Sequence, residues 1–257
     1  MSAIKPAASQ VALVTGGARR IGRAITLALV DAGYAVAIHA DHAAVDAATL
    51  CADIEKMGGL AAVVRGDLAD YAAVAALVPS AVAALGPLTL LVNSAAMFEP
   101  DEIGHLDPAL FDRQIAVNLR APLFLAQAFA TQARDGADAS IVNLLDQRVL
   151  KPTPQFMSYT LAKSALHTAT RTLAQALAPK VRVNAVAPGP TLASARQQPE
   201  DFARQAAAVP LGRGPAPEEI AAAVVFLSQA RSVTGQTLAV DGGQHIAWRT
   251  PDVGVTE

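Results

Sequence analysis

Cysteine, aromatic residues and charges are all scarce in this sequence. One of its 257 residues is a cysteine, Cys51, so the chain can form neither an intramolecular disulfide nor a cluster of thiolate metal ligands. The 5 histidines show no HExxH or HxxxH spacing, and we therefore predict no metal site. These absences exclude a disulfide-stabilised secreted scaffold and indicate a cytoplasmic protein.

The charges that are present are balanced and scattered. The 20 basic and 22 acidic residues give a net charge of -2, without the basic runs that bind nucleic acid or anionic membranes. The most apolar window, residues 74–92, is interrupted by Pro79, Gly86 and Pro87, so no membrane-spanning segment is predicted. We expect a small-molecule substrate, and neither nucleic acid nor a membrane as a partner.

Short, non-alternating apolar runs alternate with segments of helical periodicity. This pattern predicts an α/β fold in which a parallel sheet is covered on both faces by crossover helices. The expected strands are residues 11–16, 35–40, 61–67, 88–94, 140–145, 181–188 and 237–243. The expected helices are residues 20–32, 43–57, 70–85, 107–134, 156–178 and 217–229. We predict a single domain over residues 1–257, with a substrate lid at about 190–215.

A glycine-rich turn, "TGGARRIG" at residues 15–22, follows the first predicted strand and opens a helix. Glycines in such a turn let the backbone approach a pyrophosphate, and the helix N-terminus favours its negative charge. Arg20 stands where the usual GxGxxG fingerprint has its middle glycine. The segment predicts a dinucleotide site, with a simple turn as the alternative.

Tyr159 and Lys163 lie four residues apart on a predicted helix, so their side chains share one face. A cation beside a phenol stabilises the phenolate. We therefore expect Lys163 to lower the pKa of Tyr159 toward the working range of a proton donor. The alternative is a chance pair on an amphipathic helix.

Seven segments together resemble the short-chain dehydrogenase/reductase family. In chain order they are "TGGARRIG", "GDLAD", "VNSAA", "VNLRAP", "YTLAK", "APGPT" and "VDGG". The resemblance implies a doubly wound Rossmann-like fold of about seven parallel strands with helices on both faces. It also implies a nicotinamide dinucleotide, hydride transfer completed by a tyrosine acid, and a homotetramer. The tail residue Trp248 is then expected at a subunit interface or at the edge of a pocket.

The resemblance also implies roles for single residues. It makes Tyr159 the acid, lets Lys163 bind the nicotinamide ribose as well, and gives Asn118 a part in a water-linked proton path. The cofactor-binding residues that it implies are Gly16, Arg19, Arg20, Ile21, Gly22, His42, Asp67, Leu68, Asn93, Ala95, Tyr159, Lys163, Pro188, Gly189 and Thr191.

Asp146 departs from the pattern of the family, most of whose members have a serine thirteen residues before the tyrosine. A carboxylate about 4 Å from an oxygen that gains negative charge would cost up to about 4 kcal/mol at an effective dielectric constant of about 20. Simple ketone reduction is therefore disfavoured. A carboxyl group instead suits a substrate with N–H donors, or a ring nitrogen that must be protonated.

The pattern is similar to that of the pteridine reductases and dihydromonapterin reductases within this family. Asp146, Tyr159 and Lys163 match their catalytic set, and Arg20 matches an arginine near the cofactor phosphates and the substrate. Phe98 stands where they stack a pterin ring against the nicotinamide. The resemblance implies pterin reduction, with the substrate bound by Arg20, Phe98, Asp146 and Tyr159. The alternatives are a core aromatic for Phe98, a purely phosphate-binding Arg20 and a capping Asp146.

The choice between NADPH and NADH depends on the end of the second strand. Pteridine reductases commonly have an Arg-Ser pair there for the 2'-phosphate, and this chain has His42 and Ala43, preceded by Asp41. An Asp at a strand end can bind the ribose hydroxyls of NADH. Arg19, however, matches a basic residue of NADPH-preferring members, and we expect NADPH. Two other functions stay open: a reductase of a ketone, sugar or 3-oxoacyl thioester, and a nicotinamide-binding regulator without turnover.

Overall fold

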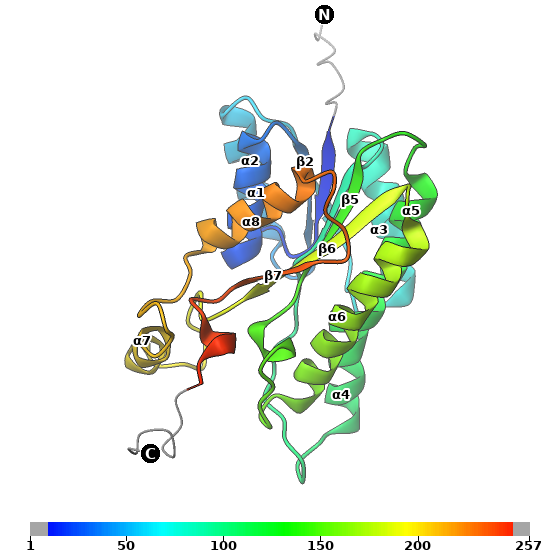
Figure 1. Cartoon of the computed structure of the whole chain (residues 1–257). Coiled ribbons are helices and arrows are strands. Elements are labelled where there is room, and N and C mark those ends of the chain that lie inside the picture. Colours follow the sequence, from blue (N-terminus) through cyan, green and yellow to red (C-terminus); the bar gives the residue numbers. More distant parts are fainter. Residues whose placement is uncertain (1–9, 249–257) are drawn as a thin grey trace, which may run out of the picture.

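Seven parallel strands form one sheet in the order β3-β2-β1-β4-β5-β6-β7, with helices on both faces (Figure 1). The computed structural model describes residues 10–248. The strands are β1 (Val11–Val14), β2 (Ala35–Ala40), β3 (Ala61–Arg65), β4 (Leu90–Asn93), β5 (Ala139–Leu144), β6 (Val181–Pro188) and β7 (Thr237–Val240). All seven predicted strands are confirmed. Several end earlier than expected, because glycine and polar turn residues follow their last paired positions.

The helices divide between the two faces of the sheet. One face carries α1 (Arg20–Asp31) and α2 (Ala44–Lys56), which pack on β1, β2 and β3, and α8 (Pro217–Gln229), which packs on β5 and β6. The other carries α3 (Tyr71–Leu85), α4 (Pro108–Ile115), α5 (Ala121–Gln132) and α6 (Met157–Leu177). Every residue of β1, β2, β4 and β5 is buried, which explains their non-alternating sequences. None of the helices within residues 10–248 is long and apolar enough to cross a bilayer.

The expected helix over residues 107–134 is present as α4 and α5, with a turn of a different helix type between them. A π-helical turn, η1 (Ala116–Arg120), separates α4 from α5. Such turns insert an extra residue into the helical repeat and often occur at functional sites. The predicted lid contains a short helix, α7 (Pro199–Ala207).

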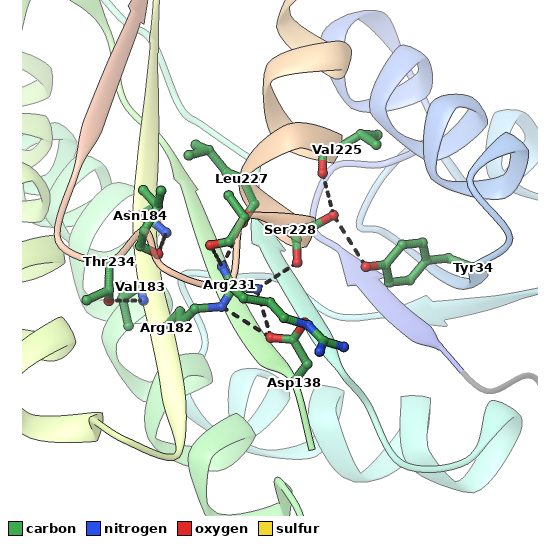
Figure 2. A network of polar contacts seen from close by, with 12 residues as sticks. Tyr34, Asp138, Arg182, Val183, Asn184, Val225, Leu227, Ser228, Arg231 and Thr234 are labelled. Atoms are coloured by element: carbon green, nitrogen blue, oxygen red, sulfur yellow. Dashed lines mark hydrogen bonds and ion pairs between the residues drawn. The ribbon is translucent and has the colours of Figure 1, made fainter. Parts of the chain in front are cut away.

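Arg182 on β6 fastens the end of α8 to the sheet (Figure 2). Its guanidinium donates to the main-chain oxygens of Leu227, Ser228 and Ala230 at distances of 2.7 to 3.0 Å. It also pairs with Asp138 at 3.1 Å. These carbonyls lie at the end of the helix and have no partner in a further helical turn, and a cation is favourable there. The network therefore fixes α8 beside the strands that carry the cavity described next.

Candidate active site

A cavity of about 1090 Å³ opens at the carboxyl ends of the parallel strands. It is lined by residues that come one or two positions after the end of four strands: Gly16 after β1, Ser94 after β4, Leu145 after β5 and Gly189 after β6. The order of the sheet reverses between β1 and β4. Ligands of open α/β sheets bind in the crevice at such a point.

The glycine turn is shaped for a close backbone approach. Gly16 has a φ of +63°, and a Cβ there would lie 3.0 Å from the Cα of Ala95. A Cβ on Gly22 would lie 2.1 Å from the carbonyl oxygen of Gly16. Within the described chain no side chain caps the first turn of α1, so its free N–H groups suit an anion. The turn therefore fits the pyrophosphate of a dinucleotide.

Most of the predicted cofactor residues line this cavity. Those that do are Gly16, Arg19, Arg20, Ile21, Gly22, Ala95, Tyr159, Lys163, Pro188, Gly189 and Thr191. Their role in binding stays a prediction, but the fold brings these residues together from four separate stretches of the chain.

Four predicted cofactor residues lie outside the cavity lining. His42 is exposed and pairs with Asp41 at 3.1 Å. Asp67 pairs with Arg113 at 3.1 Å, and the N–H of Ala69 is the main cause that lowers the pKa of its carboxyl. Leu68 belongs to the apolar core. Asn93 is also buried, and its amide donates to Asn143 at 2.8 Å.

Asp146 and Tyr159 meet on one wall of the cavity. Asp146 follows β5 and begins a short 3-10 turn, η2 (Gln147–Val149), where its Oδ1 accepts the N–H of Arg148 at 2.8 Å. Tyr159 reaches it from α6, and its hydroxyl donates to Asp146 Oδ2 at 3.2 Å. Asp146 is therefore both the capping residue of the alternative interpretation and a partner of the tyrosine. In this hydrogen bond the phenol donates and the carboxylate accepts.

The expected effect of Lys163 on the pKa of Tyr159 is wrong for this structure. Burial and the negative charge of Asp146 raise the pKa of Tyr159 well above 10, and Arg148 is the cation that opposes them. The Nζ of Lys163 instead donates to the carbonyl of Leu144 at 2.7 Å and lies 5.8 Å from the centre of the tyrosine ring. Burial lowers the pKa of Lys163 to about 8.

Asn118 lies in the π-helical turn η1 and is fully buried. Its Oδ1 accepts the N–H of Met97 at 3.1 Å, and its Nδ2 donates to the carbonyl of Met97 at 2.8 Å. Both ends of the amide thus hold the segment after β4 that carries Phe98. The part of Asn118 in a water-linked proton path stays a prediction.

Two aromatic rings and a guanidinium complete the wall, and sequence reasoning found only one of the three. The rings of Phe98 and Phe156 stack with centroids 4.1 Å apart and planes 8° apart, and Tyr159 meets Phe98 edge-on at 4.7 Å. The Cζ of Arg148 lies 5.3 Å from both centroids, so the guanidinium lies beside the stacked pair. Its Nη1 pairs with Asp146 at 3.3 Å.

Phe156 stands out by its backbone. Its φ of +56° is uncommon for a residue with a bulky side chain, and such conformations cluster at functional sites. In the sequence, an aromatic residue three positions before Tyr159 was the signal that could have indicated the place of Phe156 in the wall. Arg148 follows Asp146 by two positions in an irregular turn, so no periodicity in the sequence could have indicated that it belongs to the cavity wall.

The predicted lid contacts the cavity lining at two places, at Arg20 in the glycine turn and at the segment that carries Phe98. Arg20 donates from Nη2 to the carbonyls of Leu192 and Ala193 at 3.1 and 2.9 Å. From the lid, Arg196 pairs with Glu99 at 2.8 Å and donates to the carbonyl of Phe98. Arg20 also lines the cavity, and its role toward cofactor and substrate stays a prediction.

Comparison with known proteins points to one family. The family described as "Enoyl-(Acyl carrier protein) reductase" matches residues 16–245. Pteridine reductase 1 of Leishmania tarentolae is 33% identical over 278 residues, covering 91% of this chain and 95% of that protein. The L-rhamnose 1-dehydrogenase (NAD(P)(+)) of a Sphingomonas species is 34% identical over 244 residues, with coverage of 91% and 95%.

Solved structures give a closer similarity. The FolM alternative dihydrofolate reductase 1 of Brucella canis, complexed with NADP, is 50% identical with a TM-score of 0.93. The similarity covers 96% of this chain and 98% of that chain. The corresponding protein of Brucella suis, also in complex with NADP, gives the same identity and TM-score, with coverage of 96% and 99%.

Proposed function

Because this chain belongs to the short-chain dehydrogenase/reductase family of NAD(P)-dependent oxidoreductases, we propose that it reduces a pterin or dihydropterin with NADPH. The observation that carries the proposal is the hydrogen bond from Tyr159 to Asp146, made beside the ring of Phe98. This group combines an acceptor for a heterocyclic N–H, a proton donor and an aromatic stacking surface. The similarity to a pteridine reductase and to the FolM proteins supports it.

NADPH is the cofactor that we propose, and when bound it supplies a hydride to a ring carbon of the substrate. Two similar structures are NADP complexes, and the open N-terminus of α1 behind Gly16 suits the pyrophosphate. Arg19 is the basic residue that we assign to the 2'-phosphate. It pairs with Asp46, so binding of the phosphate requires that Arg19 leave this carboxylate or share it.

The residues of the wall divide the substrate chemistry between them. Asp146 accepts an N–H of the heterocycle and thereby orients the ring, while Arg148 balances its charge. Tyr159 donates its proton to the ring nitrogen beside the reduced carbon. Its raised pKa keeps it protonated at neutral pH, so the donor is ready before the substrate arrives. Lys163 and Arg148 are buried or nearly buried cations beside the phenolate that results.

A carbonyl substrate is the second candidate, and Arg148 is the observation that favours it. The guanidinium pairs with Asp146 at 3.3 Å and offsets part of the repulsion that an unpaired carboxylate would exert on an oxyanion. The similar L-rhamnose 1-dehydrogenase is an example of sugar chemistry in a relative. The exclusion of carbonyl compounds is therefore weaker than the sequence pattern alone indicates.

The test follows NADPH and NADH oxidation at 340 nm with 7,8-dihydropterins and dihydrofolate, in the wild type and in Asp146→Asn. Asn keeps the shape of the side chain but removes its charge. We expect oxidation of NADPH by the wild type and a loss of about 10- to 100-fold in kcat/KM in the variant, the range for a lost charged hydrogen bond.

The matched variant is Asp146→Ser, which restores the common residue of the family. If pterins are inert with the wild type and Asp146→Ser only increases the rate with ketones or sugars, the pterin proposal is overturned. The affinity for NADPH, measured in both variants, controls for damage to the cofactor site.

A further inference from the structure

A buried histidine that the proposed chemistry does not use lies behind the glycine turn. His39, on β2, is 2% exposed. Its Nδ1 lies 3.1 Å from the N–H of Gly16, and its Nε2 lies 2.9 Å from the carbonyl oxygen of Gly66. A main-chain N–H can only donate and a carbonyl can only accept. The two partners therefore define a neutral ring with its proton on Nε2.

His39 holds the turn through its main chain as well. The N–H of Gly17 donates to the carbonyl of His39 at 3.2 Å, and the hydroxyl of Thr26 on α1 donates to the carbonyl of Gly17 at 3.0 Å. Two consecutive N–H groups of the turn, those of Gly16 and Gly17, thus donate hydrogen bonds to His39. Gly66, the partner of Nε2, directly precedes Asp67, which is itself a predicted cofactor residue.

We propose that His39 is a positioning residue for the cofactor, which aligns the Gly16 turn with the neighbouring segment at Gly66. The constraint matters at Gly16 because its backbone is left-handed and because even a Cβ there would lie 3.0 Å from the Cα of Ala95, so the turn has little room to shift at the approach to the pyrophosphate. The proposal rests on dinucleotide binding and is independent of the substrate.

The charge state of the His39 ring decides whether it can accept the N–H of Gly16 and so position the turn. Burial lowers the pKa of His39, while the carbonyl of Gly66 and the carboxylates of Asp41 and Asp67 oppose the change. A protonated ring would have two donors and no acceptor for the N–H of Gly16. Acidification therefore breaks the hydrogen bond from Gly16 to His39, and the affinity for the cofactor should fall as the pH is lowered.

The first test is the Kd of NADPH, measured by the fluorescence of the bound cofactor, together with the melting temperature. His39→Leu removes both hydrogen bonds, whereas Asn in this position keeps an acceptor near the place of Nδ1. We expect a Kd at least about tenfold weaker for His39→Leu and within about threefold of the wild type for His39→Asn. His105→Asn, in an exposed loop, is the matched histidine control and should be unchanged.

Equal Kd values for His39→Leu and the wild type would overturn the proposal, as would equal losses in the Leu and Asn variants. If His39→Leu does not fold, the Kd of the wild type and of His39→Asn is compared from pH 8 to pH 5. The wild type should weaken more steeply with acid, and parallel profiles would refute the role of the ring.

None of these measurements needs a pterin, so a different substrate leaves the result intact. A wild type that binds NADH but not NADPH contradicts the proposed cofactor, and the same variants are then compared with NADH.

Discussion

At the scale of single residues, the charge balance of the site depends on which cation, Lys163 or Arg148, lies beside Asp146 and Tyr159. Lys163 matches the family pattern, but it faces the carbonyl of Leu144, while Arg148 pairs with Asp146 and acts on Tyr159. Burial and the charge of Asp146 disfavour the phenolate of Tyr159, and Arg148 is the cation that opposes them. Arg148 is thus the residue through which the charge of the site is balanced.

Replacing Arg148 by Met should therefore change the pH profile as well as the rate. Loss of the cation raises the pKa of Tyr159 further and makes the phenol a weaker acid, so we expect kcat to fall about tenfold or more. The alkaline limb of the kcat profile should move to higher pH, since the donor stays protonated longer. Steady-state kinetics from pH 6 to pH 10 measure both effects.

Arg148→Lys is the control for charge against shape. It should recover much of kcat, because Lys keeps a positive charge near Asp146 although it loses the planar contact beside Phe98 and Phe156. Equal defects in the Met and Lys variants would show that packing against the ring pair, and not charge, is what the site needs from this residue.

At the scale of elements, the start of α6 determines where Tyr159 and Phe156 lie. Phe156 occupies the N-cap position, yet the side chain that caps the helix comes from Asp101, in the segment after β4. Asp101 accepts the N–H of Ser158 at 3.1 Å and also its hydroxyl, and the carbonyl of Asp101 accepts the N–H of Met157 at 3.2 Å. The segment that carries Phe98 is thereby joined to α6, the helix that carries Tyr159.

Asp101→Ala should weaken this junction. We expect a loss of about 1 to 2 kcal/mol in the free energy of unfolding, as for other N-caps, and a fall in kcat because Tyr159 and Phe98 are no longer held together. Urea denaturation and steady-state kinetics provide the two values. In Ser158→Ala the carboxylate keeps its bond to the main-chain N–H, so both losses should be smaller. An unchanged kcat in Asp101→Ala would mean that the junction serves stability alone.

At the scale of the whole molecule, the active site has a cost in stability. Lys163 is 2% exposed, and burial lowers its pKa from 10.5 to about 8. The folded state therefore disfavours the charged amine. At about 1.4 kcal/mol for each pH unit, the penalty is on the order of 3 kcal/mol, before the bond to Leu144 offsets part of it. Functional sites commonly carry such strain.

Lys163→Met should accordingly be inactive but more stable at pH 7. Because the folded-state pKa is lowered, the unfolded chain binds more protons between about pH 8 and pH 10.5. The wild type gains stability as the pH rises through this window, and the advantage of the variant should shrink there. Thermal unfolding at pH 7 and pH 10 measures the change. A constant difference between the two proteins would contradict the assignment of the penalty to the buried amine.

The expected homotetramer also belongs to this scale and stays a prediction. Trp248, which we expect at an interface or at the edge of a pocket, is 69% exposed at the end of the described residues. The rest of the tail, residues 249–257, lies outside them.

The sequence alone determined the α/β class, all seven strands, the glycine turn and the pair of Tyr159 with Lys163. These features depend on local periodicity and on motif spacing, which are the same in the unfolded chain and in the fold. The π-helical turn within the expected helix over residues 107–134 was not predicted, because the apolar pattern of the segment continues through it without a break.

Only the tertiary structure decided which groups meet. Arg148 reaches the rings of Phe98 and Phe156, His39 bridges Gly16 and Gly66, and Asp101 caps a helix 57 positions away. Contacts of this kind depend on how packed layers bring remote segments within about 3 to 5 Å, and no spacing along the chain encodes that distance. The family pattern indicated the chemistry, and packing selected the residues that tune it.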